Sequence, residues 1–278
     1  MLTLPLSGMN EVLAFIIGIR RKTVTANLRE IKVFTTFPHR CSYLPDREAT
    51  TLFVDPRQKI TPELYTELST MGFRRSGDHI YRPHCNSCNA CMAARVAVQD
   101  FTPSKSQKRV LQANRDLTLR ITHSVNDDEA YELYERYIIQ KHADGDMYPP
   151  DREQYESFLN DSLACTQYFR LYDQDKLICV GVSDEMLDGL AAIYTFYDPD
   201  CDKRSLGTLA VLLQISHAKK RNLPFVYLGY WIEGCRKMSY KTRFRPLELL
   251  SNGRWHGIDN EPVSELSAIP VVNIPNES

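Results

Sequence analysis

Three cysteines stand close together in the first half of the chain, and their type and spacing suit them to chemistry. Cys85, Cys88 and Cys91 are each separated by two residues, in a segment with small and polar spacers. Thiolates at this spacing can converge on one metal, although zinc and iron–sulfur clusters usually take four ligands. Cys41 and His84 are the candidates for a fourth ligand. The alternative is a group of reduced cysteines without a metal, one of them a nucleophile.

The remaining cysteines do not suggest a disulfide framework. Four of them lie in or beside apolar segments and are interpreted as core residues: Cys165, Cys179, Cys201 and Cys235. The apolar run at 12–19 is too short to span a bilayer, and only Glu11 stands where a signal peptide carries basic residues. We therefore predict a cytoplasmic protein that makes no membrane contact.

Charge is distributed in blocks along the chain. Residues 1–120 carry 18 Lys and Arg against 10 Asp and Glu, and residues 203–254 carry 11 against 2. The segment between them, 121–202, carries 5 against 19. A single charged run can be an ordinary solvated surface, but two separate basic blocks favour a polyanionic partner. The first block includes Lys105, Lys108 and Arg109, whose spacing predicts one face of a helix.

A glycine-containing turn raises the possibility of a coenzyme. The segment from Arg204 to Leu209 resembles the strand-to-helix turn with which acetyltransferases bind the pyrophosphate of coenzyme A. Arg204 and Gly207 match that turn, whereas Leu209 is bulky where a small residue belongs. A coenzyme A-dependent N-acetyltransferase is therefore an alternative function.

Periodicity and capping residues predict the elements that position these groups. Helices are predicted at 61–71, about 105–116, 127–141, 150–161, 205–221 and 234–241, and strands at 73–76, 79–82, 93–99, 118–123, 167–172, 176–183, 189–197 and 225–230. From residue 118 the order β-α-α-β-β-β-α-β-α is that of the acetyltransferase-like (GNAT) fold. The predicted class is therefore α/β (α+β), with a cysteine-containing domain at 26–117 and a mixed-sheet catalytic domain at 118–250. Residues 1–25 are predicted to be a weakly structured extension, and residues 251–278 a tail.

Longer motifs make the chain resemble a known family. They are Cys-Ser-Tyr-Leu-Pro from Cys41, Gly-Phe-Arg-Arg-Ser-Gly from Gly72, Tyr-Arg-Pro-His-Cys from Tyr81, Cys-Asn-Ala-Cys from Cys88 running to Arg95, Ser-Lys-Ser-Gln-Lys-Arg from Ser104, Lys-His-Ala-Asp-Gly-Asp-Met from Lys141, Tyr-Leu-Gly-Tyr-Trp-Ile from Tyr227 and Cys-Arg-Lys-Met-Ser-Tyr-Lys from Cys235. Over about residues 26–250, the chain resembles the arginyl-tRNA–protein transferase family, and within it the bacterial members that transfer leucine.

The resemblance implies an activity and its partners. Leucine would pass from leucyl-tRNA to proteins with an N-terminal Asp or Glu, which marks them for degradation. No cofactor is required for this chemistry, because the donor is an activated ester and the acceptor amine has a pKa near 8. The residues expected to contact tRNA are Lys105, Gln107, Lys108, Arg109, Lys237 and Lys241. A non-enzymatic RNA-binding metalloprotein remains a further alternative.

The family pattern is only partly kept at the cysteines. The eukaryotic relatives have further cysteines where this chain has Leu44 and Asn89, so only Cys41 and Cys88 carry over directly. With Cys85 and Cys91 as substitutes, the expectation is a zinc or iron–sulfur site formed by these four thiolates.

The acceptor side chain needs a partner that distinguishes a carboxylate from an amide. An arginine fork does this through two parallel hydrogen bonds. Arg75 is the first candidate, Arg74 and Arg95 are substitutes, and Ser76 adjoins them. Alternatively these arginines contact tRNA or solvent, and the acceptor pocket lies near Lys241 or Arg243.

Overall fold

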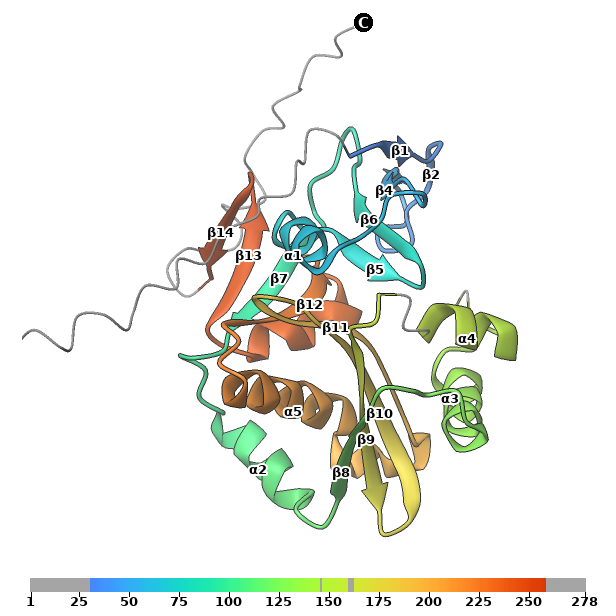
Figure 1. Cartoon of the computed structure of the whole chain (residues 1–278), viewed down its shortest axis with the longest axis vertical. Coiled ribbons are helices and arrows are strands. Elements are labelled where there is room, and N and C mark those ends of the chain that lie inside the picture. Colours follow the sequence, from blue (N-terminus) through green and yellow to red (C-terminus); the bar gives the residue numbers. More distant parts are fainter. Residues whose placement is uncertain (1–30, 146, 160–162, 259–278) are drawn as a thin grey trace, which may run out of the picture.

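The computed structural model describes residues 31–145, 147–159 and 163–258. The predicted extension at 1–25 lies outside these residues, as does most of the predicted tail. The described chain contains an eight-stranded sheet, a four-stranded sheet and a two-stranded hairpin (Figure 1). Within this part of the chain, no helix is both long enough and apolar enough to cross a membrane.

The N-terminal part is a small antiparallel sheet with one helix. Its strands lie in the order β1 (Val33–Thr35), β4 (Thr51–Val54), β6 (His79–Pro83) and β5 (Arg74–Ser76), beside the hairpin of β2 (His39–Arg40) and β3 (Glu48–Ala49). Helix α1 (Pro62–Thr70) begins as predicted: Thr61 accepts a hydrogen bond from the Leu64 amide, and Pro62 occupies the first turn. Apolar residues of α1 pack against Ala191 and Tyr227 of the large sheet and against Met186, which follows β10, so the two sheets share one core.

The large sheet has the strand order β14-β13-β7-β12-β11-β10-β9-β8. These strands are β7 (Met92–Ala97), β8 (Thr118–Thr122), β9 (Thr166–Asp173), β10 (Lys176–Glu185), β11 (Gly189–Tyr197), β12 (Phe225–Trp231), β13 (Leu247–Ser251) and β14 (Arg254–Gly257). Only the β11–β12 pair in this sheet is parallel. A parallel pair needs a crossover connection, which here includes helix α5 (Leu206–Lys220).

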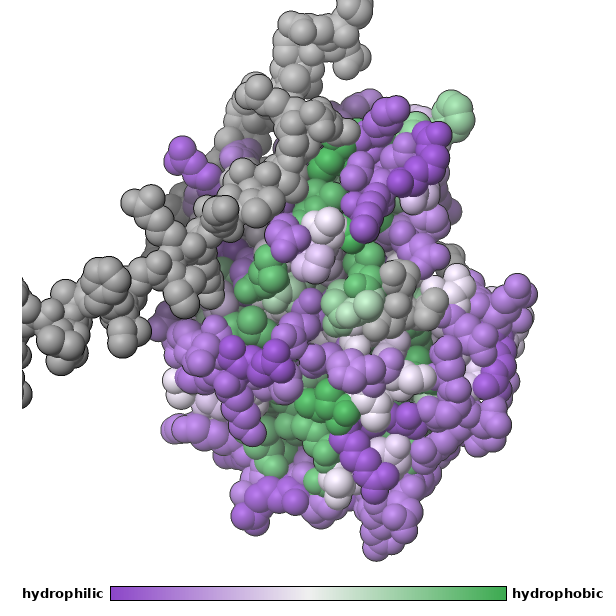
Figure 2. Space-filling view, in the orientation of Figure 1, coloured by the Kyte–Doolittle hydropathy of each residue, from purple (hydrophilic) through white to green (hydrophobic). Residues whose placement is uncertain are grey.

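Helices cover both faces of this sheet. Successive strand residues point to opposite faces, so Phe169 packs with α5 residues whereas Tyr168 packs with α3 (Asp128–Lys141) and α4 (Arg152–Leu159). Helix α2 (Lys105–Ala113) lies beside α5. Figure 2 draws the molecule in the orientation of Figure 1. In the lower half of this view, in the region of α2 and α5, hydrophobic residues are surrounded by hydrophilic ones.

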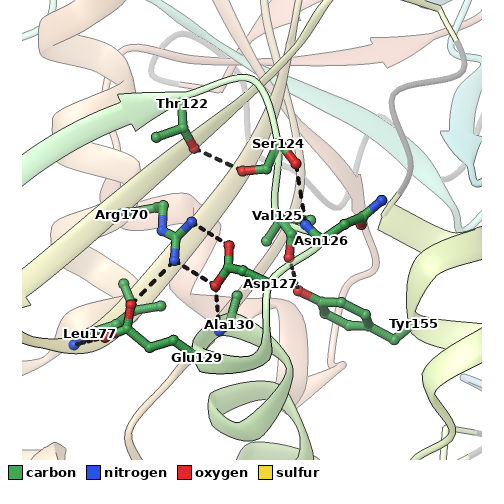
Figure 3. A network of polar contacts seen from close by, with 10 residues as sticks. All are labelled: Thr122, Ser124, Val125, Asn126, Asp127, Glu129, Ala130, Tyr155, Arg170 and Leu177. Atoms are coloured by element: carbon green, nitrogen blue, oxygen red, sulfur yellow. Dashed lines mark hydrogen bonds and ion pairs between the residues drawn. The ribbon is translucent and has the colours of Figure 1, made fainter.

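A polar network fixes the start of α3 against the sheet (Figure 3). Asp127 caps the helix by accepting from the Ala130 amide, and it accepts two hydrogen bonds from Arg170 of β9, at 2.6 and 2.9 Å. The carboxylate of Glu129 accepts from the Leu177 amide of β10. The negative caps also suit the helix N-terminus. The start of α3 is thereby held against β9 and β10.

The predicted element order from residue 118 onward is confirmed, and the mixed α/β class with it. The last predicted helix, at 234–241, is the 3-10 helix η3 (Arg236–Arg243). Three features differ from expectation. Strands β1 to β4 lie in a segment for which no strand was predicted. Residues 251–258, predicted as tail, include the end of β13 and all of β14, and β7 lies between β12 and β13. A segment assigned to the N-terminal domain therefore supplies an inner strand of the large sheet, because its apolar residues are buried on both faces.

Candidate active-site cavity

The two parallel strands separate along their length and leave a cavity. β11 and β12 pair only at residues 189–191 with 225–227, although both strands continue further. The pairing of β12 with β7 shifts register between Tyr227 and Gly229, and Gly229 has a φ of +79°, which favours glycine. Beyond this bulge a cavity of about 680 Å³ is lined by Ala192 of β11 and Leu228 of β12.

The cavity lies where the two parts of the molecule meet. The N-terminal part supplies Arg74, Arg75, Tyr43 and Tyr81, and η3 supplies Lys237, Met238, Tyr240 and Lys241. The remaining walls come from the end of α3, from β11 and from the first turn of α5, including Gly207. The N-terminus of a helix favours negative charge. The cavity therefore combines basic side chains, aromatic rings and a helix N-terminus.

Arg75 lines this cavity, but its guanidinium is already occupied. It donates from Nε to Asp184 Oδ2 at 2.6 Å, from Nη2 to Asp184 Oδ1 at 2.8 Å and from Nη1 to the Gly77 carbonyl at 3.0 Å. Burial alone would lower the pKa of Arg75, but the hydrogen bonds and charge of Asp184 outweigh this effect and raise it. The first candidate for acceptor recognition is thus a structural ion pair, since its fork has no free face for a second carboxylate.

Arg74, its neighbour on β5, is also buried but has no carboxylate partner in the described chain. It is 6% exposed, and its Nε and Nη1 atoms have no hydrogen-bond partner within the described chain. Its Nη2 makes only long contacts, of 3.4 Å to the Ala94 carbonyl and 3.5 Å to the Gly229 carbonyl. Burial lowers the pKa of Arg74. This arginine can therefore pair with an anionic ligand, because unpaired buried polar groups are unfavourable.

The other two acceptor candidates lie outside the cavity lining. Arg95 donates to Glu248 Oε2 at 2.6 Å, and its guanidinium carbon lies 3.6 Å from the ring centre of Phe225 and 4.1 Å from that of Trp255. Ser76 ends β5 in register with His79. Arg95 therefore joins β7 to β13 and to aromatic neighbours instead of facing a ligand.

Lys241 was expected at the tRNA surface, and the structure corrects that assignment. It is 7% exposed, lines the cavity, and donates from Nζ to the Tyr230 carbonyl. A Cβ at Gly229 would lie 3.6 Å from this Nζ. Burial, followed by the charge of Arg74, lowers the pKa of Lys241 to about 8. An ammonium enclosed in this way belongs to the cavity and not to a phosphate-binding surface.

Gln107 is also a structural residue and not an exposed tRNA contact. Its side chain closes the capping box with Ser104, and its Nε2 donates to the Arg243 carbonyl at 3.0 Å. Lys105, Lys108 and Arg109 on the same helix are exposed. The bond from Gln107 to η3 brings the two basic blocks of the sequence together.

Lys237 keeps a position suited to an anionic partner. Its side chain is 78% exposed and lies 3.7 Å from Asp144, and the residue also lines the cavity. Arg204, in the glycine-containing turn, is instead bound to Asp116 at 2.8 Å and to Asp173 at 3.1 Å. Leu209 is buried in the core. Arg204 and Leu209 of that turn therefore serve the fold, whereas Gly207 lines the cavity.

The predicted metal ligands lie near one another but not in a metal-binding arrangement. Cys85 and Cys88 face each other in an antiparallel bridge. The pKa of Cys91 is raised to about 12, first by burial and then by the neighbouring thiols of Cys85, Cys41 and Cys88. Across the described ranges, no three His, Cys, Asp or Glu residues are grouped so as to hold a metal ion. The described residues as arranged do not fit the expected zinc or iron–sulfur site.

Some residues of the site had no signal in the sequence. Asp184 stands near the end of an apolar strand, and nothing local indicated that it would meet Arg75. Gly229 and Tyr230 appeared only as part of a longer motif. Tyr137 and Tyr194, which line the α3 side of the cavity, were indistinguishable from core aromatics.

Comparisons with known proteins agree with this architecture. The family descriptions "Arginine-tRNA-protein transferase, N terminus" and "Arginine-tRNA-protein transferase, C terminus" match residues 39–109 and 129–251. A protein of Pseudomonas entomophila named "Aspartate/glutamate leucyltransferase" is 52% identical over 228 residues, which is 82% of this chain and 97% of the relative. One of the same name from Teredinibacter turnerae is 50% identical over 233 residues, 84% of this chain and 96% of the relative.

Among solved structures, similarity is more distant. The C-terminal domain of a putative lysylphosphatidylglycerol synthetase from Agrobacterium fabrum has a TM-score of 0.43 at 14% identity, covering 76% of this chain and 70% of that one. The two family matches occupy both parts of the molecule that form the cavity. On these matches and the close relatives, the chain belongs to the arginine-tRNA–protein transferase family.

Proposed function

We propose that this protein transfers leucine from leucyl-tRNA to the N-terminal Asp or Glu of acceptor proteins and thereby marks them for degradation. The names of its close relatives support this reaction. The structural observation that carries the assignment is Arg74, a buried guanidinium that lines the cavity without a carboxylate partner in the described chain. Since leucyl-tRNA is made in the cytoplasm, we place the reaction there.

Arg74 recognises the acceptor side chain in this proposal. A carboxylate from Asp or Glu supplies both the charge and the two acceptor oxygens that its fork lacks. The amide of Asn or Gln supplies no charge, and its NH2 group would face a donor. Nη2, whose two contacts are long, shares one edge of the guanidinium with Nε and the other edge with Nη1, so that it presents two donors to the incoming carboxylate together with either of them. Arg75 supports this arrangement by fixing β5 against the end of β10.

The donor approaches over the joined basic surface. This surface consists of Lys105, Lys108 and Arg109 of α2 together with Lys237 and Arg243 of η3, which Gln107 connects. Such cations bind phosphates without reading base sequence. Because Lys237 belongs both to this surface and to the cavity lining, the aminoacylated end of the tRNA would enter beside it.

The chemistry needs little beyond positioning. The acceptor α-amine, once it has lost its proton, attacks the ester carbonyl of leucyl-tRNA. An amide C–N bond forms, the C–O bond to the terminal ribose breaks, and the ribose oxygen takes a proton. Holding amine and ester together supplies much of the rate enhancement. Lys241 lies on the same wall as Arg74 and is suited to stabilise the tetrahedral oxyanion, since buried donors act most strongly there.

One assay tests the proposal against coenzyme A chemistry. The full-length protein is incubated with labelled leucyl-tRNA or labelled acetyl-coenzyme A, together with matched peptides that begin with Asp, Glu, Asn or Gln. We expect label from leucyl-tRNA only, on the Asp and Glu peptides. Label from acetyl-coenzyme A would contradict the proposal, as would equal labelling of the Asn peptide.

A further inference from the structure

The cavity is lined by two kinds of side chain. Arg74 and Lys241 are buried cations, close enough for the charge of Arg74 to act on Lys241, and Lys237 is an exposed cation. Ala192, Val211, Leu206 and Tyr194, from β11 and α5, are apolar or aromatic. If the proposed function holds, the acceptor carboxylate pairs with the buried cations, and the amino acid of the donor packs against the apolar side chains.

The described lining of the cavity carries little negative charge, and Asp144, which lies outside that lining, is 3.7 Å from Lys237. Of the described residues that line the cavity, the single acid is Asp202, whose side chain is 66% exposed and whose two oxygens accept from Lys141 at 2.9 and 3.0 Å. Asp184 is not part of the lining, and its carboxylate accepts hydrogen bonds from Arg75, Tyr65 and Thr166. No carboxylate of the described lining is therefore left for a cationic donor side chain.

The cavity also disfavours the charged form of Lys241, one of the cations in its own lining. The pKa of Lys241 falls to about 8 because of its burial and because of the charge of Arg74. An acceptor carboxylate would neutralise one of these charges and leave the other. A further cation entering the cavity would lose its hydration and meet the remaining positive charge without a partner.

We infer that this cavity selects its aminoacyl donor by charge: an uncharged side chain such as leucine is accepted, and a guanidinium or ammonium side chain is rejected even on the same tRNA. The inference rests on the proposed function and goes beyond it, because it names what decides between leucine and arginine. Selection would occur at the amino acid, independently of the tRNA body. Size plays the smaller part, since neutral side chains as long as arginine should still enter.

The test uses one tRNA body charged chemically with leucine, methionine, citrulline or arginine. Citrulline matches arginine in length and shape but has no charge. Transfer to a peptide beginning with Asp is measured in single turnovers at saturating enzyme. We expect leucine and methionine to transfer, and citrulline to transfer at least about tenfold faster than arginine. Equal rates for citrulline and arginine would overturn charge selection, whereas absence of leucine transfer would contradict the proposed function itself.

A substitution at the edge of the cavity provides a second measurement. Lys237→Glu adds a carboxylate beside the cavity, and Lys105→Glu makes the same charge change on α2, outside the lining. The ratio of arginine to citrulline transfer should rise several-fold in Lys237→Glu and stay constant in Lys105→Glu. Because both amino acids are attached to the same tRNA, any change in tRNA affinity cancels in this ratio. A ratio that does not move in Lys237→Glu, or that moves equally in both variants, would overturn the inference.

Discussion

The Arg75–Asp184 ion pair and the neighbouring cations Arg74 and Lys241 are all buried, but only the first group contains a carboxylate. Arg75 is matched atom by atom by Asp184, Gly77 and Thr166. Arg74, one residue earlier on the same strand, has two unpaired nitrogens in the described structure. A buried charge whose partner lies within the fold becomes strongly destabilising when that partner is removed, whereas one without a partner is available to a ligand.

The largest effect is expected when the Arg75–Asp184 ion pair is broken. Asp184→Asn leaves the Arg75 guanidinium buried without its counter-charge, since the pair is almost inaccessible to solvent. We expect the free energy of unfolding to fall by about 3–5 kcal/mol, measured by urea denaturation. Asp202→Asn is the matched control: it removes an exposed pair with Lys141 and should change stability far less. Equal losses in the two variants would contradict the contrast.

The second prediction concerns Arg74, the buried cation without a carboxylate partner in the described structure. Arg74→Met should lower kcat/KM for an Asp-starting peptide by about tenfold to a hundredfold, the size of a charge-assisted interaction. Preference for Asp over Asn should largely disappear, while stability stays equal or rises, because an unpaired buried cation is removed.

Arg95→Met is the control for that experiment. Arg95 is buried to a similar extent but is paired with Glu248 outside the cavity. Its loss should reduce stability and leave the preference for Asp intact. If Arg74→Met destabilised the protein and retained that preference, the acceptor site would have to lie elsewhere.

A third prediction concerns the pH dependence of stability at Lys241. The folded pKa is about 8, below the ordinary value of 10.5. Between these values the unfolded chain binds more protons than the folded chain, so the contribution of Lys241 to stability rises with pH. Relative to Lys241→Met, the wild-type protein should gain about 1–2 kcal/mol between pH 7.5 and 9.5. Comparing the two proteins removes the contribution of other titrating groups, and a constant difference would contradict the lowered pKa.

The smallest effect is expected at an exposed cation. Lys108→Gln removes one charge from the surface that we assign to tRNA. The dependence of log affinity on log salt should become shallower by about one unit, with only a few-fold weaker binding at physiological salt. Acceptor preference should not change, which separates surface cations from those of the cavity. An unaltered salt dependence would remove Lys108 from the tRNA surface.

Local patterns were sufficient for most of the secondary structure. Capping residues such as Thr61 and Ser104 begin helices where the sequence predicts them, because a cap satisfies backbone amides within three residues. Strands β13 and β14 were missed because their short apolar runs become strands only by pairing with β7 and with each other. Such pairing joins residues far apart in the chain, and no local period records it.

The sequence by itself determined the family, the element order and the presence of arginines and lysines suited to anions. Only the tertiary structure decided which of them are free. Arg74 and Arg75 are identical in type and adjacent in sequence, but alternate strand residues face different neighbours. Asp184, 109 residues after Arg75, occupies one of them, and the separation of β11 from β12 leaves the other at a cavity. Whether a buried charge is compensated depends on distant segments meeting, which is a property of the folded chain.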